Sequence, residues 1–427
     1  MIARLILAGL LAFTAAPALA ETLAIVGARV VTLGPAGDLP SATVVVRDGK
    51  IAAVGTAAAA PAGARVIDGQ GLVLTPGLVA TVTPLALNDT IGSGYGGLGS
   101  RNPRLSAAFD VLPDVNPTSP QIPEARIEGV TRAIVAPNPP GGPSGEAYRI
   151  FGGLAGLITL GEGQGPALAP ALAVVSGAGS GGAAAAGGSR GAWRTLLDQS
   201  MALARDSQRA PERVSAERLA ELSLSRADLA ALVPVAAGRR PLLVEVNRAS
   251  DIRNVLAAAE ANRIRVVLSG AAEAWMVADE IARARVPVIL DAEDNQAFTF
   301  ESLNANYRNA AILHEAGVLV AFKPGIARIV FQIRTPRFLA GRTVPFGLPW
   351  EEALKAITLN PARIFGFADR SGSIETGKDA DLVLWSGDPL ETTTVARLVI
   401  IGGEIQPATA RNRLLRDRYL GDVRPVP

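Results

Sequence analysis

The 427-residue sequence contains no cysteine, a single histidine (His314), three methionines and only 4% aromatic residues. Without cysteine the chain forms no disulfide, so its stability must come from burial of apolar side chains. Imidazole is the ordinary ligand of catalytic zinc, and one histidine cannot build a multi-histidine metal site. The few aromatics are not interleaved with Lys/Arg blocks, so nothing in the sequence indicates nucleic-acid binding.

Residues 1–20 join one early cation, Arg4, to an apolar run that ends in Ala18-Leu19-Ala20. This pattern is typical of a cleaved secretory signal peptide, and a periplasmic location is the expected destination. The alternative, a membrane anchor, is disfavoured because the apolar run is shorter than the roughly 20 residues that a span needs. No membrane span is expected after the signal, since charges, glycines and prolines interrupt every later apolar segment.

Two distant regions have the pattern of antiparallel strands joined by tight turns. Residues 22–55 contain short Val/Ile-rich runs divided by the turn signals Gly34-Pro35-Ala36-Gly37-Asp38 and Asp48-Gly49. Residues 379–406 repeat this pattern near the other end of the chain. We therefore expect a small composite β-sandwich domain built from residues 22–75 and 371–410, followed by a C-terminal tail over 411–427.

Between these regions, apolar runs of strand length alternate with charged, Ala-rich stretches of helical spacing. The apolar runs cover residues 132–137, 171–177, 241–247, 264–270, 286–292 and 317–323. Such alternation predicts an α/β fold with a parallel sheet, and the number of units favours a TIM-type (β/α) barrel over residues 76–370. Residues 86–125 and 138–166 are predicted to be long loops over the barrel mouth, and the Gly/Ala-rich segment 178–189 is predicted to be mobile.

Five short motifs in this order give the sequence a resemblance to a known family. They are Asp48-Gly49-Lys50-Ile51, Leu74-Thr75-Pro76-Gly77-Leu78-Val79, Thr358-Leu359-Asn360-Pro361-Ala362, residues 372–383 (GSIETGKDADLV) and Gly387-Asp388-Pro389. Over nearly the whole chain after residue 20, the sequence resembles the amidohydrolase superfamily, specifically the exported imidazolonepropionase-like amidohydrolases. The resemblance implies a hydrolase that acts on cyclic amides or other non-peptide carbon–nitrogen bonds and uses zinc or another divalent metal.

The catalytic motifs of that family are missing from this chain. Where relatives would have an acidic residue and a His-x-His pair, this chain has Ala80, Thr81, Val82, Thr83 and Pro84, with Val82 and Pro84 at the imidazole positions. Two further ligand positions hold Glu245 and Ser269-Gly270, and Lys323-Pro324-Gly325 replaces the segment with the catalytic aspartate. His314 falls at an ordinary helix position. The resemblance therefore implies a pseudoenzyme candidate with no metal and no other cofactor.

Polar residues do follow the predicted strands, and parallel strands place such residues at one mouth. The predicted catalytic residues are Glu245, Lys323 and Asp291, and the predicted ligand-binding residues are Asn247, Arg248 and Glu273. In one interpretation Glu245 and Lys323 form a buried ion pair that replaces a lost metal ion. In another, Lys323 polarises a carbonyl or binds an anion while Glu245 or Asp291 acts as general base. A third is a Ca²⁺ or Mg²⁺ site formed by Asp291, Glu293 and Asp294.

Two functions thus stay open at this point. One is hydrolysis of a cyclic amide, weak or altered because the metal ligands are missing. The other is a catalytically inactive barrel that binds a small molecule or a partner protein at the former active-site mouth. The sequence leaves the substrate and the oligomeric state undetermined, because specificity depends on the geometry of the loops.

The first testable prediction concerns metal content. Protein purified without chelator should contain no stoichiometric zinc, iron or manganese by plasma mass spectrometry, because carboxylates, hydroxyls and an ammonium replace the imidazole ligands. A metal-dependent hydrolase purified in the same way serves as the control. One tightly bound equivalent of a transition metal would contradict this ligand argument.

Overall fold

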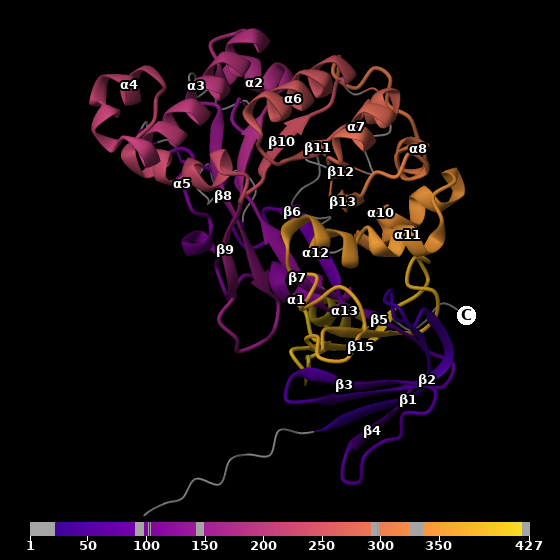
Figure 1. Ribbon diagram of the computed structural model, residues 1–427. Helices are drawn as coiled ribbons and strands as arrows, with labels where there is room; N and C mark the ends of the chain where they lie inside the picture. The colour runs from indigo at the N-terminus through magenta and orange to yellow at the C-terminus, as the bar shows by residue number, and fades with distance from the viewer. Residues whose placement is uncertain are drawn as a thin grey trace, which may run out of the picture.

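The computed structural model describes residues 22–89, 98–100, 102, 104–141, 149–291, 297, 299–324 and 336–420. The predicted signal peptide lies outside these residues. Within them, no helix is long and apolar enough to cross a membrane. Figure 1 shows two β-sheets, one surrounded by helices and one nearly free of them.

The first sheet, sheet A, combines strands from both ends of the chain. Its strands are β1 (Leu23–Val31), β2 (Asp38–Arg47), β3 (Lys50–Gly55), β4 (Arg65–Asp68), β5 (Val73–Pro76), β14 (Leu382–Trp385), β15 (Ala396–Ile401) and β16 (Glu404–Ile405). They run in the order β16-β15-β14-β5-β1-β2-β3, and β4 also pairs with β1. The two ends meet where β5 pairs antiparallel with β14. The expected sharing of one β unit by distant segments is thus found.

The second sheet, sheet B, follows the order β13-β12-β11-β10-β9-β8-β7-β6. Its strands are β6 (Leu78–Thr83), β7 (Val130–Val135), β8 (Phe151–Thr159), β9 (Ala167–Gly177), β10 (Leu242–Val246), β11 (Val266–Gly270), β12 (Val288–Asp291) and β13 (Val320–Lys323). The six apolar runs expected as barrel strands correspond to β7, β9 and β10 to β13. The predicted fold class, an α/β barrel with a second, smaller β unit built from both ends of the chain, is confirmed.

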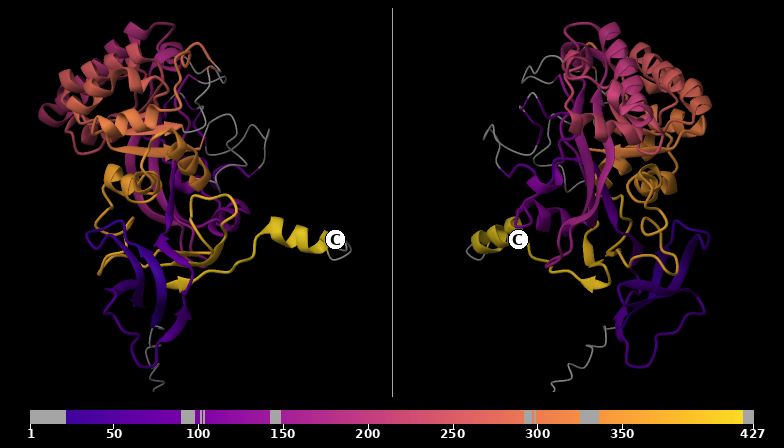
Figure 2. Two further views of the ribbon diagram at one scale, coloured as in Figure 1. Left: turned by 90° about the vertical axis from the view of Figure 1, so that its right-hand side faces the viewer. Right: turned by 60° about the vertical axis from the view of Figure 1, so that its left-hand side comes forward.

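Helices surround sheet B. They are α1 (Gln121–Arg126), α2 (Gly179–Ala185), α3 (Arg190–Arg209), α4 (Ala216–Glu221), α5 (Arg226–Ala236), α6 (Ala249–Asn262), α7 (Ala278–Ala284), α8 (Asn309–Glu315), α10 (Pro336–Thr343), α11 (Trp350–Lys355) and α12 (Leu359–Phe365). Short 3₁₀ turns are η1 (Leu112–Asp114), η2 (Pro211–Arg213), η3 (Ala274–Val277) and η5 (Val344–Phe346). The last helix, α13 (Arg411–Leu420), projects from the body in Figure 2.

A short segment after α11 joins the two edges of sheet B. Phe322 of β13 donates its N–H to the carbonyl of Ala356 at 3.1 Å, and Val79 of β6 donates to the carbonyl of Ile357 at 2.8 Å. Residues 356 and 357 therefore take the place of direct pairing between β13 and β6. The barrel is nearly closed, and α12 starts directly after this segment.

The expectation of an entirely parallel barrel with a loop over 138–166 was wrong in one respect. Strand β8 runs antiparallel to both β7 and β9. Its glycines suggested a loop, but they allow close packing: a Cβ at Gly153 would lie 2.5 Å from the carbonyl oxygen of Phe109, and one at Gly156 would lie 2.6 Å from Leu112. Glycine is used here for close approach within a strand.

The Gly/Ala-rich segment 178–189, predicted to be mobile, contains helix α2. Helix α2 packs closely against β9, since a Cβ at Gly182 would lie 2.3 Å from the carbonyl oxygen of Gly177. The N–H of Ser180 also donates to Glu301 Oε1 at 3.0 Å. Low complexity here reflects a close helix–strand contact that only small residues permit.

A buried charge cluster links the barrel to sheet A. Arg132 of β7 donates from Nε to Asp381 Oδ2 and from Nη2 to Asp379 Oδ2, both at 2.6 Å, and its side chain is 5% exposed. Asp379 also pairs with Lys50 and Arg370. The hairpin turn Asp48-Gly49 precedes Lys50, and both turn residues have the positive φ that a type I′ turn requires. The motifs around residues 48–50 and 379–381 therefore form one junction.

We expect Arg132→Met to lower the free energy of unfolding by about 3–5 kcal/mol, because it leaves two buried carboxylates without their shared cation. Arg308→Met is the matched control: its pair with Glu315 is more than half exposed, so its loss should cost at most about 1 kcal/mol. Urea denaturation at neutral pH measures both. Equal effects of the two substitutions would contradict a central role for this junction.

The same junction predicts an acid sensitivity. Burial raises the pKa of Asp379, but hydrogen bonds from Lys50 and Arg132 outweigh it and hold that pKa below its ordinary value. A carboxyl group with a lowered folded-state pKa stabilises the fold above its unfolded pKa, and this stability is lost as pH falls through the folded value. Unfolding measured from pH 7 to pH 3 should show that loss, and the loss should be smaller in Asp379→Asn.

Candidate functional site

Four neighbouring strands carry an apolar residue and then, two positions later on the same face, a polar one. The apolar residues are Leu243, Val267, Ile289 and Ala321, which belong to one buried cluster with residues of α12. The polar residues at the strand ends are Glu245, Ser269, Asp291 and Lys323. Because side chains alternate along a strand, both sets face the barrel interior. The interior thus has an apolar layer near α12 and a polar layer at the carboxyl ends.

The polar layer contains the predicted ion pair. Lys323 Nζ lies 2.7 Å from Glu245 Oε2, and the two side chains are 3% and 18% exposed. Ser269 Oγ donates to the same Glu245 oxygen at 2.6 Å, from the residue paired with Glu245 in the neighbouring parallel strand. Glu245 Oε2 is therefore held by one ammonium and one hydroxyl. Oε1 of the same carboxylate accepts no hydrogen bond from the described residues.

Asp291 is the last residue of β12 and is the register partner of Lys323 on β13. It is 7% exposed, so the structure brings a second buried carboxyl group to the polar layer. The predicted cation-binding residues Glu293 and Asp294 lie outside the described residues. The predicted catalytic set of Glu245, Lys323 and Asp291 thus falls on three strands of one barrel end.

The predicted ligand-binding residues have different surroundings. Glu273 is buried, and both carboxylate oxygens have protein partners: Oε2 accepts from the N–H of Ala249 at 3.0 Å, and Oε1 accepts from the N–H and side chain of Asn304. Glu273 therefore holds the first turn of α6 and the loop after β12. Asn247 Oδ1 accepts weakly from the N–H of Ala272 at 3.4 Å. Arg248 lies exposed just before α6.

The first barrel strand, β6, has no strong metal ligand where the resemblance would place the metal-binding histidines. Thr81 and Thr83 are buried, and both hydroxyl groups make local hydrogen bonds with backbone atoms. Val82 has a φ of +52°, unusual for a β-branched residue, and the register of β6 shifts at this point. His314 lies on α8, where its Nδ1 is 3.9 Å from Glu352 Oε2, consistent with its predicted structural position.

A zinc-type metal does not fit this donor set. Within the described residues, no group of three or more His, Cys, Asp or Glu side chains is placed to hold a metal ion. The carboxylate at the centre of the polar layer already binds an ammonium and a hydroxyl group, neither of which is a zinc ligand in its protonated form. The geometry instead presents a positive charge, Lys323, beside one carboxylate oxygen that can accept a ligand hydrogen bond.

Two features of this barrel end were missed by the sequence reasoning. The sequence placed Ser269 at a lost metal-ligand position and did not predict its hydrogen bond to Glu245. The two residues lie opposite each other on neighbouring strands, so the strand pairing could have predicted this bond. A second cluster joins Arg190 to Asp251 at 3.1 Å and to Glu301 at 2.5 Å, across α3, α6 and the loop after β12. No spacing in the sequence indicated this cluster.

Comparison with known sequences gives partial matches. Residues 253–406 match the model of the amidohydrolase family. Over 67 residues the chain is 39% identical to amidohydrolase tasK of Hapsidospora irregularis, covering 16% of this chain and 7% of that protein. Over 87 residues it is 40% identical to imidazolonepropionase of Porphyromonas gingivalis, covering 19% of this chain and 20% of the relative. The matches span a fifth or less of each relative, but they support the amidohydrolase superfamily.

Comparison with solved structures extends over most of the chain. The crystal structure of an amidohydrolase from Thermotoga maritima MSB8 aligns with a TM-score of 0.78 and 22% identity, covering 91% of this chain and 100% of that one. A prolidase complexed with N-methylphosphonate-L-proline aligns with a TM-score of 0.56 and 17% identity, covering 90% and 99% of the two chains. At these identities the likeness shows the fold alone.

The ion pair predicts a thermodynamic coupling. Lys323→Met should lower the free energy of unfolding by about 2–4 kcal/mol, because it leaves a largely buried carboxylate with one neutral partner. Combining it with Glu245→Gln should recover at least half of that loss. Lys355→Met removes a lysine whose partners lie on the surface of α11 and serves as control. Strictly additive effects of the two site substitutions would show that the pair is not coupled.

Proposed function

We propose that this protein is a member of the amidohydrolase superfamily that binds a small carbonyl compound at the barrel mouth without a metal ion, with weak or absent hydrolysis. The observation that carries this proposal is the 2.7 Å contact between Lys323 and Glu245 in the polar layer at the strand ends. Chemistry in such barrels takes place at this end. Here a fixed ammonium provides the positive charge that a metal ion would otherwise provide.

The ammonium can replace only part of what a metal ion does. Lys323 has three N–H donors, of which one is directed to Glu245 Oε2, so donors remain for a carbonyl or carboxylate oxygen of a ligand. Glu245 Oε1 can in turn accept from an amide N–H. This pairing of donor and acceptor fits the two faces of an amide group. An ammonium does not, however, generate the hydroxide nucleophile that a bound metal ion supplies at neutral pH.

The chemical class of the ligand is inferred from the resemblance and the partial matches together. Imidazolonepropionase of Porphyromonas gingivalis matches this chain over 87 residues, and its name identifies a cyclic amide type of substrate for that protein. A cyclic amide presents a carbonyl and an N–H on one edge. We therefore infer a cyclic amide or a closely related ring as the ligand class for this chain. Export to the periplasm, proposed from residues 1–20, would place the binding there.

Slow metal-independent hydrolysis is a second candidate, favoured by Glu245 Oε1, which accepts no hydrogen bond from the part of the chain that the structure describes. In that case Glu245 would take a proton from water as the water oxygen adds to the carbonyl carbon, with Lys323 polarising the carbonyl. Glu245 would then give that proton to the leaving nitrogen as the carbon–nitrogen bond breaks, and Asp291 is the alternative base. General acid–base catalysis of this kind contributes about 10²–10⁴-fold. Turnover that survives chelator and disappears in Glu245→Gln would favour this candidate over binding alone.

The deciding experiment measures binding of hydantoin, 2-imidazolidinone and 5-oxoproline by ligand-observed NMR, using protein dialysed against EDTA. We expect at least one ring to bind, binding to be unchanged by EDTA, and Lys323→Gln to weaken it about tenfold through loss of a charged donor. Lys355→Gln should have no effect.

Folding of each variant is checked by its thermal midpoint, and Glu245→Gln provides a second, milder test of the same contact. Absence of binding by all three rings would overturn the proposal. Hydrolysis that requires added zinc would also overturn the proposal, because it would show a metal-dependent activity.

A further inference from the structure

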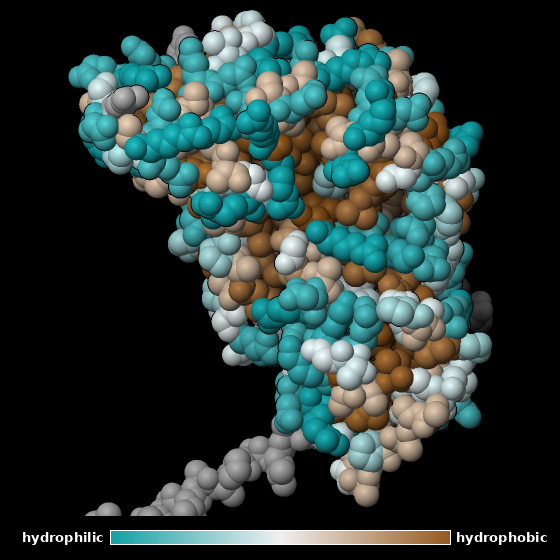
Figure 3. Space-filling view, in the orientation of Figure 1, coloured by the Kyte–Doolittle hydropathy of each residue, from teal (hydrophilic) through white to brown (hydrophobic). Residues whose placement is uncertain are grey.

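A hollow of about 980 Å³ lies at the opposite end of the barrel strands from the polar layer. Its lining includes the residues that precede or begin β11, β12 and β13, together with parts of α6, α7 and α12. In Figure 3 a hollowed brown, apolar area is visible between teal, polar rims in the upper part of the molecule. Sites for small organic ligands have volumes of about 300–1,000 Å³, so this hollow is large enough for one.

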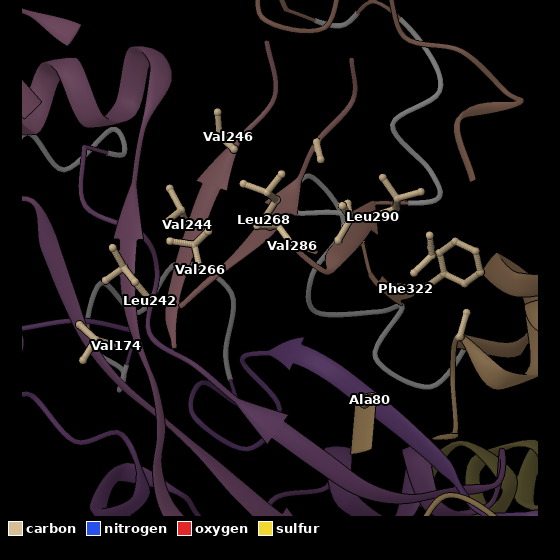
Figure 4. Packing of buried hydrophobic residues seen from close by; sticks show 14 of the residues in the cluster. Ala80, Val174, Leu242, Val244, Val246, Val266, Leu268, Val286, Leu290 and Phe322 are labelled. Carbon is tan, nitrogen blue, oxygen red and sulfur yellow. The ribbon is translucent and has the colours of Figure 1, made fainter. Parts of the chain in front are cut away.

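The floor of the hollow is apolar. It is formed by Ile264, Val266, Val267, Val286, Leu319 and Ile364. Val266 and Val286, labelled in Figure 4, come from the strand starts and are buried. A ligand with a hydrocarbon or aromatic body would cover the apolar surface that stays exposed there, which includes the partly buried Leu256 and Leu319.

The rim of the hollow is basic. The lining contains five arginines and two glutamates, which are Arg253, Arg265, Arg283, Arg285, Arg363, Glu260 and Glu280. Glu280 pairs with Arg253 at 2.8 Å. Among the described residues, Arg265 and Arg285 have no carboxylate within ion-pair distance. Several guanidinium groups around one hollow repel each other, and a bound anion would relieve this repulsion.

One of these arginines occupies a position that disfavours it. Arg285 ends α7 with a φ of +54°, in the left-handed region where glycine is ordinarily preferred. An arginine there is strained, because its Cβ crowds the backbone in this conformation. Arg263 ends α6 in the same conformation, with a φ of +50°, but is not among the residues that line the hollow. The two helix ends form a natural pair for comparison.

We propose that this hollow is a binding site for a small amphipathic organic anion, with a carboxylate or phosphate head at the arginine rim and an apolar body on the floor. Guanidinium groups suit both heads, because their paired N–H donors match the geometry of carboxylate and phosphate oxygens. The site lies at the beginning of the strands and the polar layer at their end. It is therefore independent of the function proposed for the barrel mouth.

The first experiment compares three probes by isothermal titration calorimetry. Octyl phosphate should bind with a Kd of about 1 mM, the affinity that a well-fitting ligand of its size typically reaches. Inorganic phosphate lacks the tail and 1-octanol lacks the charge, so each should bind at least about tenfold more weakly. Equal binding of 1-octanol would overturn the role of the arginines, and equal binding of inorganic phosphate would overturn the role of the floor.

The second experiment tests the location. Arg285→Gly should weaken octyl phosphate binding about tenfold while leaving the thermal midpoint unchanged or higher, because glycine relieves the left-handed strain. Arg263→Gly should make the same change in midpoint without affecting binding. A lower midpoint with unchanged binding in Arg285→Gly would show that this arginine serves only the end of its helix.

A third pair of variants changes volume instead of charge. Ala257 is exposed on α6 and lines the hollow, whereas Ala261 is exposed on the same helix outside it. Ala257→Trp should abolish octyl phosphate binding by filling the space, and Ala261→Trp should leave it intact. Unchanged binding in Ala257→Trp would place the ligand elsewhere.

Discussion

The ion cluster around Arg132 holds the two halves of this structure together. Its guanidinium group leaves the barrel at β7 and reaches two aspartates that immediately precede β14 of sheet A. A buried guanidinium is stable only with its hydrogen bonds satisfied, and here one planar fork is matched to two carboxylates. The cluster therefore fixes where the chain returns from the barrel. Because Asp381 also accepts from the N–H of Gly402 at 2.8 Å, the neighbouring hairpin is fixed at the same time.

A second group of buried charges lies at the barrel mouth, and there too each buried charge depends on a partner of opposite charge. Lys323 is almost completely buried, so its charge is tolerated only because Glu245 lies beside it. Neither residue could be replaced alone without leaving a costly partner behind. A change from a metal centre to an ion pair would thus require several positions to change together. The other polar side chains described there, Ser269 and the two buried threonines of β6, carry hydroxyl groups, which are weak metal ligands.

Much of this could be predicted from the sequence where local pattern and topology agree. Val/Ile-rich runs located six of the barrel strands, and Asp48-Gly49 located a hairpin, because both depend on nearby residues. Glu245 and Lys323 could be paired because strand-end residues of a parallel sheet converge. Strand β8 and helix α2 were missed since their glycines, usually a sign of loops, are needed here for close contacts made by distant residues. The cap formed by Glu273 depends on loop geometry that no spacing encodes.

The pairing of β5 with β14 has a consequence for the order in which the molecule can form. Leu382 of β14 lies opposite Pro76 of β5. This edge of β5 therefore stays unpaired until β14, about 300 residues later in the chain, reaches it. Until then β5 presents one unpaired edge, which invites pairing with other chains. Sheet A is therefore completed only when the two ends of the chain meet, and until then this edge of β5 is exposed to other chains.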